Sequence, residues 1–433
     1  LAVRLLDEGG TVEVKAGALA DGAGNRIAPE NILFQRVYYA LERKIWDDRN
    51  CFPVADGPWQ CRLGETFWIL TTIHVPESTP AGNYAGVFSL AAGERSVEIP
   101  VELAVLARPV PAPEMPFGAF MPGHYHRESE GCYVNYAPEW QTPENLERWV
   151  RLWKSRGLNS PFLFHLYADI EMVDGEIRLD IPFLNDLIKL MRQYEMPGPL
   201  LLDMRHLSWW SHAVALKLAA SGESPDHATP GVRGPDGLSL ADTGTREFPA
   251  AAKEIFRRTM EAFVSRYGDC GIPLLYLSEE EIGYHQINGF FNTKTVGYET
   301  FNPVLADVVG MDRVCLVDNS QGYGYPGIDR GARDGVPFRS YNNWTEEALA
   351  RARRDGAQVW LYNGGWSRPI AAYLMRLGAR AFHQWADGWW DPGYGYWLVT
   401  AVNADGALSS LQLERTVEGM NDLGYFKLLD EWQ

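Results

Sequence analysis

Short apolar runs alternate with helical patterns from residue 117 to the end of the chain. Each run is bounded by turn-forming or polar residues, which is typical of a buried strand. We predict eight such strands: Phe117–Met121, Ser160–Leu166, Pro199–Asp203, Leu274–Ser278, Arg313–Asp318, Pro337–Tyr341, Gln358–Asn363 and Ala379–Trp385. Because helical patterns separate most of them, the sequence predicts an α/β fold with a (β/α)8 TIM barrel.

The expected helices carry recognisable start and stop signals. Thr142, followed by Pro143 and an acidic residue, is typical of a helix N-terminus, and Gly157 is typical of its end. Thr345 opens a second helix of this kind, which we expect to end near Gly356. The other helical patterns cover Leu184–Gln193, Pro249–Tyr267, Pro369–Leu377 and Leu411–Leu429.

The first 108 residues follow a different pattern, in which apolar and polar positions alternate as in half-buried strands. The alternation covers Thr11–Val14, Phe67–Ile73 and, less strictly, Ser96–Leu103, and Pro80–Gly86 has the composition of a turn. Four prolines then fall between positions 109 and 116 and predict a stiff connector. We therefore expect an N-terminal β-sandwich domain at 1–108, a linker at 109–116 and a catalytic barrel at 117–433.

Composition narrows the classes of function. The chain has 433 residues with 39 Lys+Arg against 56 Asp+Glu, a formal net charge of −17. This balance argues against nucleic acid or an anionic membrane as the main partner. No apolar run approaches the roughly 20 residues of a membrane-spanning helix. The 16 Trp and 20 Tyr residues favour a sugar ligand, because sugar rings present apolar C–H faces to aromatic planes.

The five cysteines have no metal-binding spacing, and their odd number gives no disulfide framework, although Cys51 and Cys61 could pair. The chain starts at Leu1 without a signal peptide, so we expect a processed or trimmed start. The sequence has neither the Gly-x-Ser-x-Gly elbow of serine hydrolases nor a phosphate-binding glycine loop. We expect no cofactor and leave the oligomeric state open.

The carboxyl end of every predicted strand is polar or aromatic, which is where barrel enzymes carry their active sites. We predict the following residues to bind substrate: His124, Arg205, His206, Trp209, Tyr284, Asn342, Tyr362, Asn363, Trp366, Trp385 and Asp387. Some have structural alternatives. Arg205 could be the buried partner of Asp203, and Trp209 with Trp210 could anchor a loop. The spacing of His124 and His126 could ligate a metal, but two ligands alone are a weak signal.

The fourth predicted strand ends in Ser278 followed by three consecutive glutamates, Glu279, Glu280 and Glu281. Neighbouring carboxylates repel one another, and we expect the repulsion to raise the pKa of one of them toward neutrality, as a general acid requires. Glycoside hydrolysis needs such an acid beside a second group that meets the positive charge at the sugar. That second group is either a carboxylate or the 2-acetamido group of the substrate. A solvated acidic loop is the alternative.

Four stretches resemble glycoside hydrolase family 123 and its relatives with a DUF4091-type C-terminal region. Trp68–Gly86 is similar to the β-sandwich segment of the family, and Tyr276–Glu280 falls where the family has a strand that ends in Asp-Glu. Trp385 follows a strand like the eighth of the family, and Glu414–Phe426 resembles its closing helix. The stretches occur in the family's order over nearly the whole chain. The family contains retaining β-N-acetylgalactosaminidases, and it favours a secreted or periplasmic location.

The resemblance implies an exo-acting, retaining enzyme for β-linked N-acetylhexosaminides of the GalNAc type. Glu280 would be the general acid/base, and Glu279 would polarise the acetamide where the family has Asp. The extra methylene of Glu279, and Glu281 in place of the Pro of the family, keep two alternatives open. One is a sugar without an acetamido group, with Asp203, Asp318 or Asp387 as the second carboxylate. The other is a carbohydrate-binding barrel without catalysis.

Overall fold

The computed structural model describes residues 1–6, 9–39, 51–54, 57–108, 110–111, 114–125, 142–164, 166–232, 251–277, 280–281, 301, 303–318, 336–341, 344–362, 368–384, 389–391, 395–397, 400–403 and 406–431. They form two compact units. The first comprises Leu1–Pro113, Val399–Asn403 and Leu408–Gln433, and the second comprises Glu114–Leu398 and Ala404–Ala407. The expected boundaries of the sandwich, linker and barrel stay a prediction.

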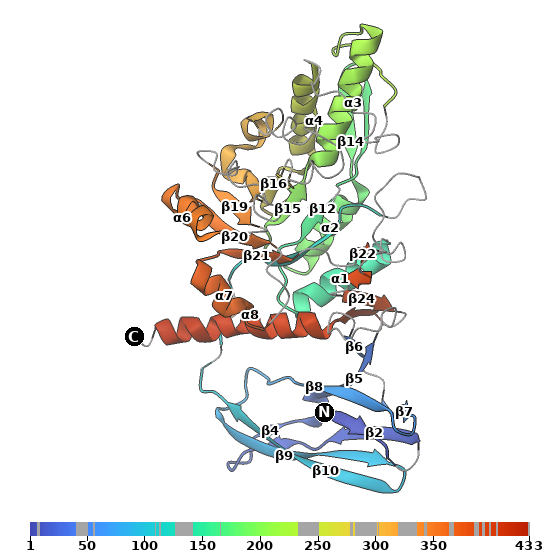
Figure 1. Ribbon diagram of the computed structural model, residues 1–433, viewed down its shortest axis with the longest axis vertical. Helices are drawn as coiled ribbons and strands as arrows, with labels where there is room; N and C mark the ends of the chain where they lie inside the picture. The colour runs from blue at the N-terminus through green and yellow to red at the C-terminus, as the bar shows by residue number, and fades with distance from the viewer. Residues whose placement is uncertain are drawn as a thin grey trace. The chain divides into compact units, whose positions relative to one another are not determined.

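Two antiparallel sheets make up most of the first unit (Figure 1). One has the order β1 (Ala2–Arg4), β8 (Thr66–Ile73), β5 (Ile32–Tyr39) and β6 (Cys51–Val54). The other has the order β4 (Arg26–Ile27), β3 (Leu19–Ala20), β9 (Gly82–Ala92), β2 (Gly10–Ala16) and β7 (Trp59–Cys61), and β10 (Arg95–Val105) pairs with β9. The unit also contains the 3-10 turn η1 (Pro29–Asn31), strand β24 (Thr400–Asn403), which pairs with β25 (Gly406–Ser409), and helix α8 (Leu411–Asp430).

The two sheets pack through a shared apolar core. Phe34 on β5 meets Phe88 on β9 edge to face, with ring centroids 5.0 Å apart. The predicted turn at Pro80–Gly86 is shorter than expected, because β9 already begins at Gly82. Tyr84 is fully buried in this strand and its hydroxyl donates to the carbonyl of Pro80 at 2.9 Å, which closes the shorter turn.

The second unit contains a curled, all-parallel sheet with helices around it (Figure 1). Its order is β16 (Leu274–Leu277), β15 (Leu200–Asp203), β12 (Phe162–Phe164), β11 (Phe117–Pro122), β21 (Ala381–Gln384), β20 (Gln358–Tyr362), β19 (Phe338–Tyr341), β18 (Cys315–Asp318) and β17 (Glu280–Glu281). All eight predicted strands are confirmed within a few residues. On one side of β11 the strands follow in chain order to β16. On the other side they follow in reverse chain order from β21 to β17, as the βα pattern predicts.

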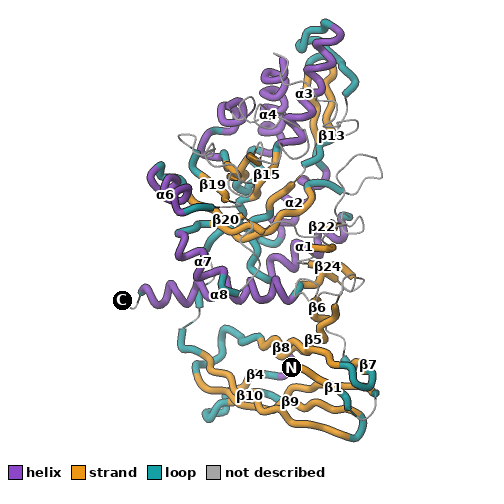
Figure 2. Tube along the Cα trace, in the orientation of Figure 1, coloured by secondary structure: helices purple, strands orange, loops and turns teal. Residues whose placement is uncertain are grey.

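The described helices of this unit are α1 (Pro143–Ser155), α2 (Pro182–Gln193), α3 (Arg205–Ser221), α4 (Ala251–Tyr267), α6 (Glu346–Arg354) and α7 (Ile370–Leu377), with the 3-10 turn η6 (Met311–Arg313). Thr142 and Thr345 cap α1 and α6 as predicted, each hydroxyl accepting a backbone N–H three residues on. Helices α3 and α4 lie side by side (Figure 2) and are joined by a hydrogen bond between Ser211 and Thr259. Two hairpins complete the unit: β13 (Asp169–Val173) with β14 (Glu176–Asp180), and β22 (Trp389–Asp391) with β23 (Gly395–Trp397).

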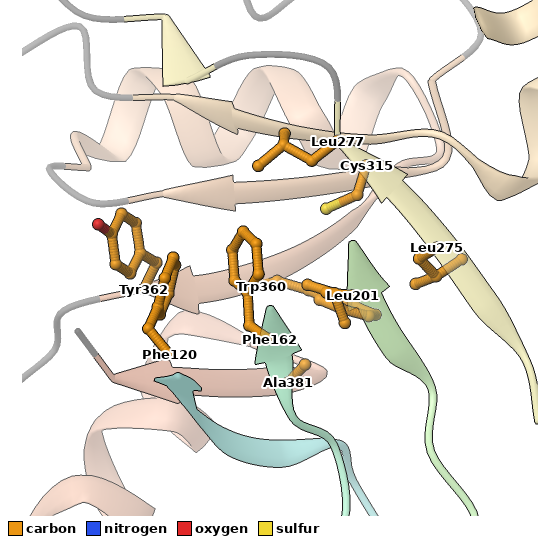
Figure 3. Packing of buried hydrophobic residues seen from close by; sticks show 9 residues of the cluster. All are labelled: Phe120, Phe162, Leu201, Leu275, Leu277, Cys315, Trp360, Tyr362 and Ala381. Atoms are coloured by element: carbon orange, nitrogen blue, oxygen red, sulfur yellow. The ribbon is translucent and has the colours of Figure 1, made fainter. Parts of the chain in front are cut away.

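An interior cluster of buried side chains fills the curl of the sheet (Figure 3). Its members are Phe120, Phe162, Leu201, Leu275, Leu277, Cys315, Trp360, Tyr362 and Ala381. Successive members on one strand are two residues apart, as in Leu275 and Leu277, because side chains alternate between the two faces of a strand. This alternation identifies the register positions that face the interior.

A second buried group overlaps this cluster at Trp360 and centres on His383, which is in register with Tyr362. His383 is completely buried, stacks on Trp360 at 5.5 Å and lies 3.0 Å from the hydroxyl of Ser160. Ser160 donates its own proton to the carbonyl of Pro199, so Nε2 of His383 must be the donor to Ser160. Glycine at position 118 allows the backbones of Gly118 and Ser160 to lie close together, because a Cβ there would lie 1.8 Å from the carbonyl oxygen of Ser160. We call Gly118, Ser160, Trp360 and His383 the inner histidine cluster.

Candidate functional site

Four aromatic rings form a continuous row at the carboxyl ends of β11, β12 and β15. The ring of His124 meets Tyr167 at 4.3 Å, Tyr167 meets His206 at 4.1 Å, and His206 meets Trp209 at 4.8 Å between centroids. Three of these residues were predicted to bind substrate. The sequence also places Tyr167 at a strand end, but not among the binding residues. We call this group the ring row.

The ring row is closed at one end and open at the other. His124, Tyr167 and His206 are 6%, 6% and 7% exposed, whereas Trp209 is partly exposed. Edge-to-face and tilted contacts of this kind fix each ring through its neighbour and contribute about 0.5–1.5 kcal/mol per pair. The row therefore provides a rigid wall that ends in an accessible indole, which is suited to the apolar face of a sugar ring.

Helix α3 positions the second half of the row. Its first residue, Arg205, follows Met204, whose N–H donates to the carbonyl of Leu277 on the neighbouring strand at 2.6 Å. Consecutive helical residues point in different directions, so Trp209 joins the row while Trp210 is buried and its indole N–H donates to Val232 at 3.3 Å. The alternative that Trp209 and Trp210 anchor a loop is wrong, because both lie in α3; of the two residues, Trp210 is the buried one.

The loop after β11 positions the first half of the row. Nδ1 of His124 lies 3.0 Å from the carbonyl oxygen of Tyr125. The hydroxyl of Tyr125 donates to Asp186 on α2 at 2.6 Å, and its ring meets Phe183 on the same helix at 5.1 Å. Burial and the Asp186 carboxylate raise the pKa of Tyr125, so this donor stays protonated. Sequence reasoning missed Tyr125 and Asp186, because it could not tell which helix packs beside this loop.

Asp203 and Tyr362 face the interior of the curl. Asp203 is 0% exposed and pairs in register with Leu277, a member of the interior cluster. Tyr362 is buried in the same cluster and stacks on Phe120 at 4.5 Å. Asp203 thus brings a buried carboxyl group to the carboxyl end of β15, beside the strand that precedes the three glutamates.

The backbone register separates Glu280 from Glu281. Glu280 pairs with Val317, and the pairing continues through Ser340 and Trp360 to Ala381. Trp360 and Ala381 belong to the interior cluster, and paired residues of parallel strands share a face. Glu280 therefore occupies an inward-facing position.

Glu281 occupies the opposite face of the sheet. It pairs with Asp318, which is in register with Tyr341 and through it with Leu361 and Phe382. These partners alternate with the inward-facing positions along β18, β19, β20 and β21. Two glutamates that are adjacent in the sequence are thus assigned to different sides of the same sheet.

This register depends on one extra residue between β16 and β17. Tyr276 bridges to Val314, and Glu280 pairs with Val317. The chain advances four residues from Tyr276 to Glu280 but three from Val314 to Val317. Between these two pairings the chain thus has one residue more than the partner strand, and Glu280 falls in register with Trp360.

The remaining predicted site residues are outside the described part of the chain, namely Glu279, Tyr284, Asn342, Asn363, Trp366, Trp385 and Asp387. Arg205 is described by its backbone only, as the first residue of α3. Within the described ranges, no group of three or more His, Cys, Asp or Glu residues could hold a metal ion. In the same ranges, no helix is both long and apolar enough to cross a membrane.

Comparisons with known proteins support the fold. No protein-family model matches the chain, and no curated protein matches it. Among solved structures, a family 123 glycoside hydrolase from Clostridium perfringens, described in terms of glycolipid glycan hydrolysis, is similar with a TM-score of 0.68. The similarity covers 99% of this chain and 82% of that one, at 13% identity. At this identity, the similarity establishes a shared fold.

Two mannanases are similar at a lower level. One is the β-(1,4)-mannanase GH26-CBM35 from Podospora anserina, with a TM-score of 0.33, 12% identity and coverage of 96% and 86% of the two chains. The other is an endo-β-1,4-mannanase from Thermotoga petrophila, with a TM-score of 0.39, 8% identity and coverage of 72% and 76%. TM-scores this low do not support a conclusion about the fold of this chain.

Proposed function

We propose that the chain is a glycoside hydrolase built on a closed (β/α)8 barrel, with an N-terminal β-sandwich domain at 1–108. The pairing of the curled sheet supports closure, because the strand at one end also bridges to the residue that precedes β18, near the other end. Tyr276, on β16, bridges to Val314, and Glu280 pairs with β18. The shared fold with a family 123 glycoside hydrolase supports the same architecture.

Glu280 is the general acid/base of the proposed reaction. The observation that carries this assignment is the register of Glu280 with Trp360 and Ala381 of the interior cluster. In a barrel, an inward-facing position just beyond the carboxyl end of a strand opens into the active site. Glu281 occupies a register position on the other face.

The proposed reaction retains the anomeric configuration and acts on terminal, β-linked N-acetylhexosaminides of the GalNAc type. Glu280 gives its proton to the glycosidic oxygen while the acetamido oxygen of the substrate attacks the anomeric carbon, and the aglycone leaves as an alcohol. Glu279 polarises the acetamide. Glu280 then takes a proton from water, which opens the cyclic intermediate, so two inversions give net retention.

A panel of aryl glycosides tests this function. We expect hydrolysis of the N-acetyl-β-D-galactosaminide and no hydrolysis of the β-galactoside or β-glucoside. Glu280→Gln should lower kcat about a thousandfold on a substrate with a poor leaving group, because such a group depends on protonation. The matched control Glu281→Gln should stay within about threefold of the wild type. A loss in Glu281→Gln with activity kept in Glu280→Gln would overturn the assignment, and undiminished ligand binding without turnover would indicate a binding barrel.

A glycosidase for a sugar without the acetamido group is the second candidate. The buried, inward-facing Asp203 favours it, because a carboxylate there could serve as the nucleophile. Of the other carboxylates considered, Asp318 pairs in register with Tyr341 on the opposite face, and Asp387 is outside the described residues. Hydrolysis of plain β-glycosides alone, abolished in Asp203→Asn, would select this mechanism over substrate assistance.

A further inference from the structure

The loop that carries His124 is tied to helix α2 by a side chain that does not belong to the ring row. We propose that Tyr125 and Asp186 are positioning residues, which fix the ring of His124 as a hydrogen-bond acceptor for a hydroxyl group of the sugar. This proposal rests on the proposed glycosidase function. The two residues would set the tautomer and the orientation of the His124 ring, and both can be measured with or without catalytic turnover.

The hydrogen bond at Nδ1 determines which ring nitrogen of His124 carries the proton. Nδ1 lies 3.0 Å from the carbonyl oxygen of Tyr125, and a carbonyl oxygen can only accept a hydrogen bond. Nδ1 must therefore carry the proton. In the neutral ring Nε2 then has the lone pair, which is the form that accepts a hydrogen bond from a sugar hydroxyl.

Two contacts to helix α2 hold Tyr125, whose carbonyl oxygen accepts this bond. Tyr125 donates its hydroxyl proton to Oδ2 of Asp186 at 2.6 Å, and its ring lies against Phe183, which is buried on the same helix. A short bond to a carboxylate is stronger than one between neutral groups. The backbone at Tyr125 is thus held by two contacts to a regular helix rather than by a loop alone.

The position of His124 affects the rest of the ring row. His124 packs edge to face on Tyr167, which in turn contacts His206, so a shift of His124 disturbs the wall beyond it. Sites keep their geometry only where neighbouring residues lock the rotamers of the contacting side chains. Loss of the anchor should therefore weaken binding of the substrate and of the transition state equally, which raises KM and leaves kcat unchanged.

Steady-state kinetics on 4-nitrophenyl N-acetyl-β-D-galactosaminide test the positioning role. We expect Tyr125→Phe to raise KM about tenfold with kcat within about twofold of the wild type. The matched control is Tyr194→Phe. Tyr194 donates to Glu147 on α1 at 2.7 Å, which is the same chemistry outside the ring row, and both constants should stay unchanged.

Variants of Asp186 separate the hydrogen bond from the packing. Asp186→Asn keeps an oxygen acceptor, so its KM should stay close to that of the wild type. Asp186→Leu removes the acceptor and should raise KM as much as Tyr125→Phe does. An unchanged KM in Tyr125→Phe, or an equal rise in Tyr194→Phe, would overturn the proposal.

Nitrogen-15 NMR of the histidine rings gives a readout that does not need turnover. His124 is assigned by the signal that His124→Gln removes. We expect an Nδ1–H tautomer in the wild type and a loss of this preference in Tyr125→Phe. An Nε2–H tautomer in the wild type would refute the anchor, even if the enzyme hydrolyses the probe. Absence of hydrolysis, together with the expected tautomer, would instead refute the glycosidase function and leave the anchor intact.

Discussion

Two clusters combine histidine with aromatic rings in the same unit, yet their surroundings differ. The ring row lies at the carboxyl ends of the strands and ends in the partly exposed Trp209. The inner histidine cluster is sealed, and His383 within it is held by Ser160. The comparison teaches that residue type alone does not assign a role. Exposure increases along the ring row toward Trp209 but stays low throughout the inner cluster, so substitutions should affect binding at the ring row and stability at the inner cluster.

The largest effect on stability is expected from Gly118→Ala. The added Cβ would lie 1.8 Å from the carbonyl oxygen of Ser160, so two strands must move apart. Overpacking of this kind should reduce the free energy of unfolding by about 3–5 kcal/mol, measured by urea denaturation. Gly10→Ala serves as the control, because nothing lies within 4 Å of its added Cβ. Equal stability of the two variants would contradict the tight packing of the inner cluster.

Asp355→Asn tests whether the amino-end side of the sheet depends on a buried charge. Nη2 of Arg339 lies 2.8 Å from Oδ2 of Asp355, and the arginine is almost completely buried. Removal of the carboxylate leaves a buried positive charge and should cost about 3 kcal/mol of unfolding free energy.

The exposed pair Arg257–Asp307 provides the comparison for that variant. Asp307→Asn should change the unfolding free energy by less than about 1 kcal/mol, because water screens the pair. Similar losses in Asp355→Asn and Asp307→Asn would show that burial of Arg339 does not matter.

The inner cluster should also make stability depend on pH. Burial lowers the pKa of His383 to about 3, and Nδ1 has no hydrogen-bond partner within the described part of the chain. The unfolded chain takes up this proton below about pH 6.5, whereas the folded one does not until about pH 3. Stability is therefore lost as pH falls through this window, by about 1.4 kcal/mol per pH unit for this group. His383→Gln should show a correspondingly smaller slope in urea titrations between pH 6.5 and 4.5.

Between the two clusters, the smaller effect on stability is expected at the open end of the ring row. Trp209→Ala should change the unfolding free energy by about 1 kcal/mol, because the indole is already partly exposed. The same variant should raise KM for the aryl glycoside about tenfold, since a sugar ring loses its stacking surface. A larger loss of stability than in Gly118→Ala would remove the contrast between the two clusters.

Most of the sheet could be predicted from the sequence because apolar runs bounded by polar residues are local signals. Helix α3 could not, since its apolar residues surround the whole helix and show no clear period. The hairpin of β13 and β14 had a signal that was overlooked. Asp174 and Gly175 both have positive φ, as the Asp-Gly pair of a tight hairpin turn requires.

The candidate site was predicted in parts. His124, His206 and Trp209 follow from the rule that strand ends carry function, and the structure brings them together through Tyr167. Their order in the row depends on which strands are neighbours, and this is a tertiary property. The anchor at Asp186 was hidden for the same reason, because a polar position on an amphipathic helix is ordinarily solvated.

The extra residue between Tyr276 and Glu280 makes the choice of carboxylate a matter of counting. Strand positions have a parity, and every insertion or deletion of one residue reverses it. Deletion of the extra residue, however, would make both strands advance three residues between these pairings, so Glu280 would stay beside Val317. In a lineage of such proteins, this one residue could therefore be lost while Glu280 kept its position.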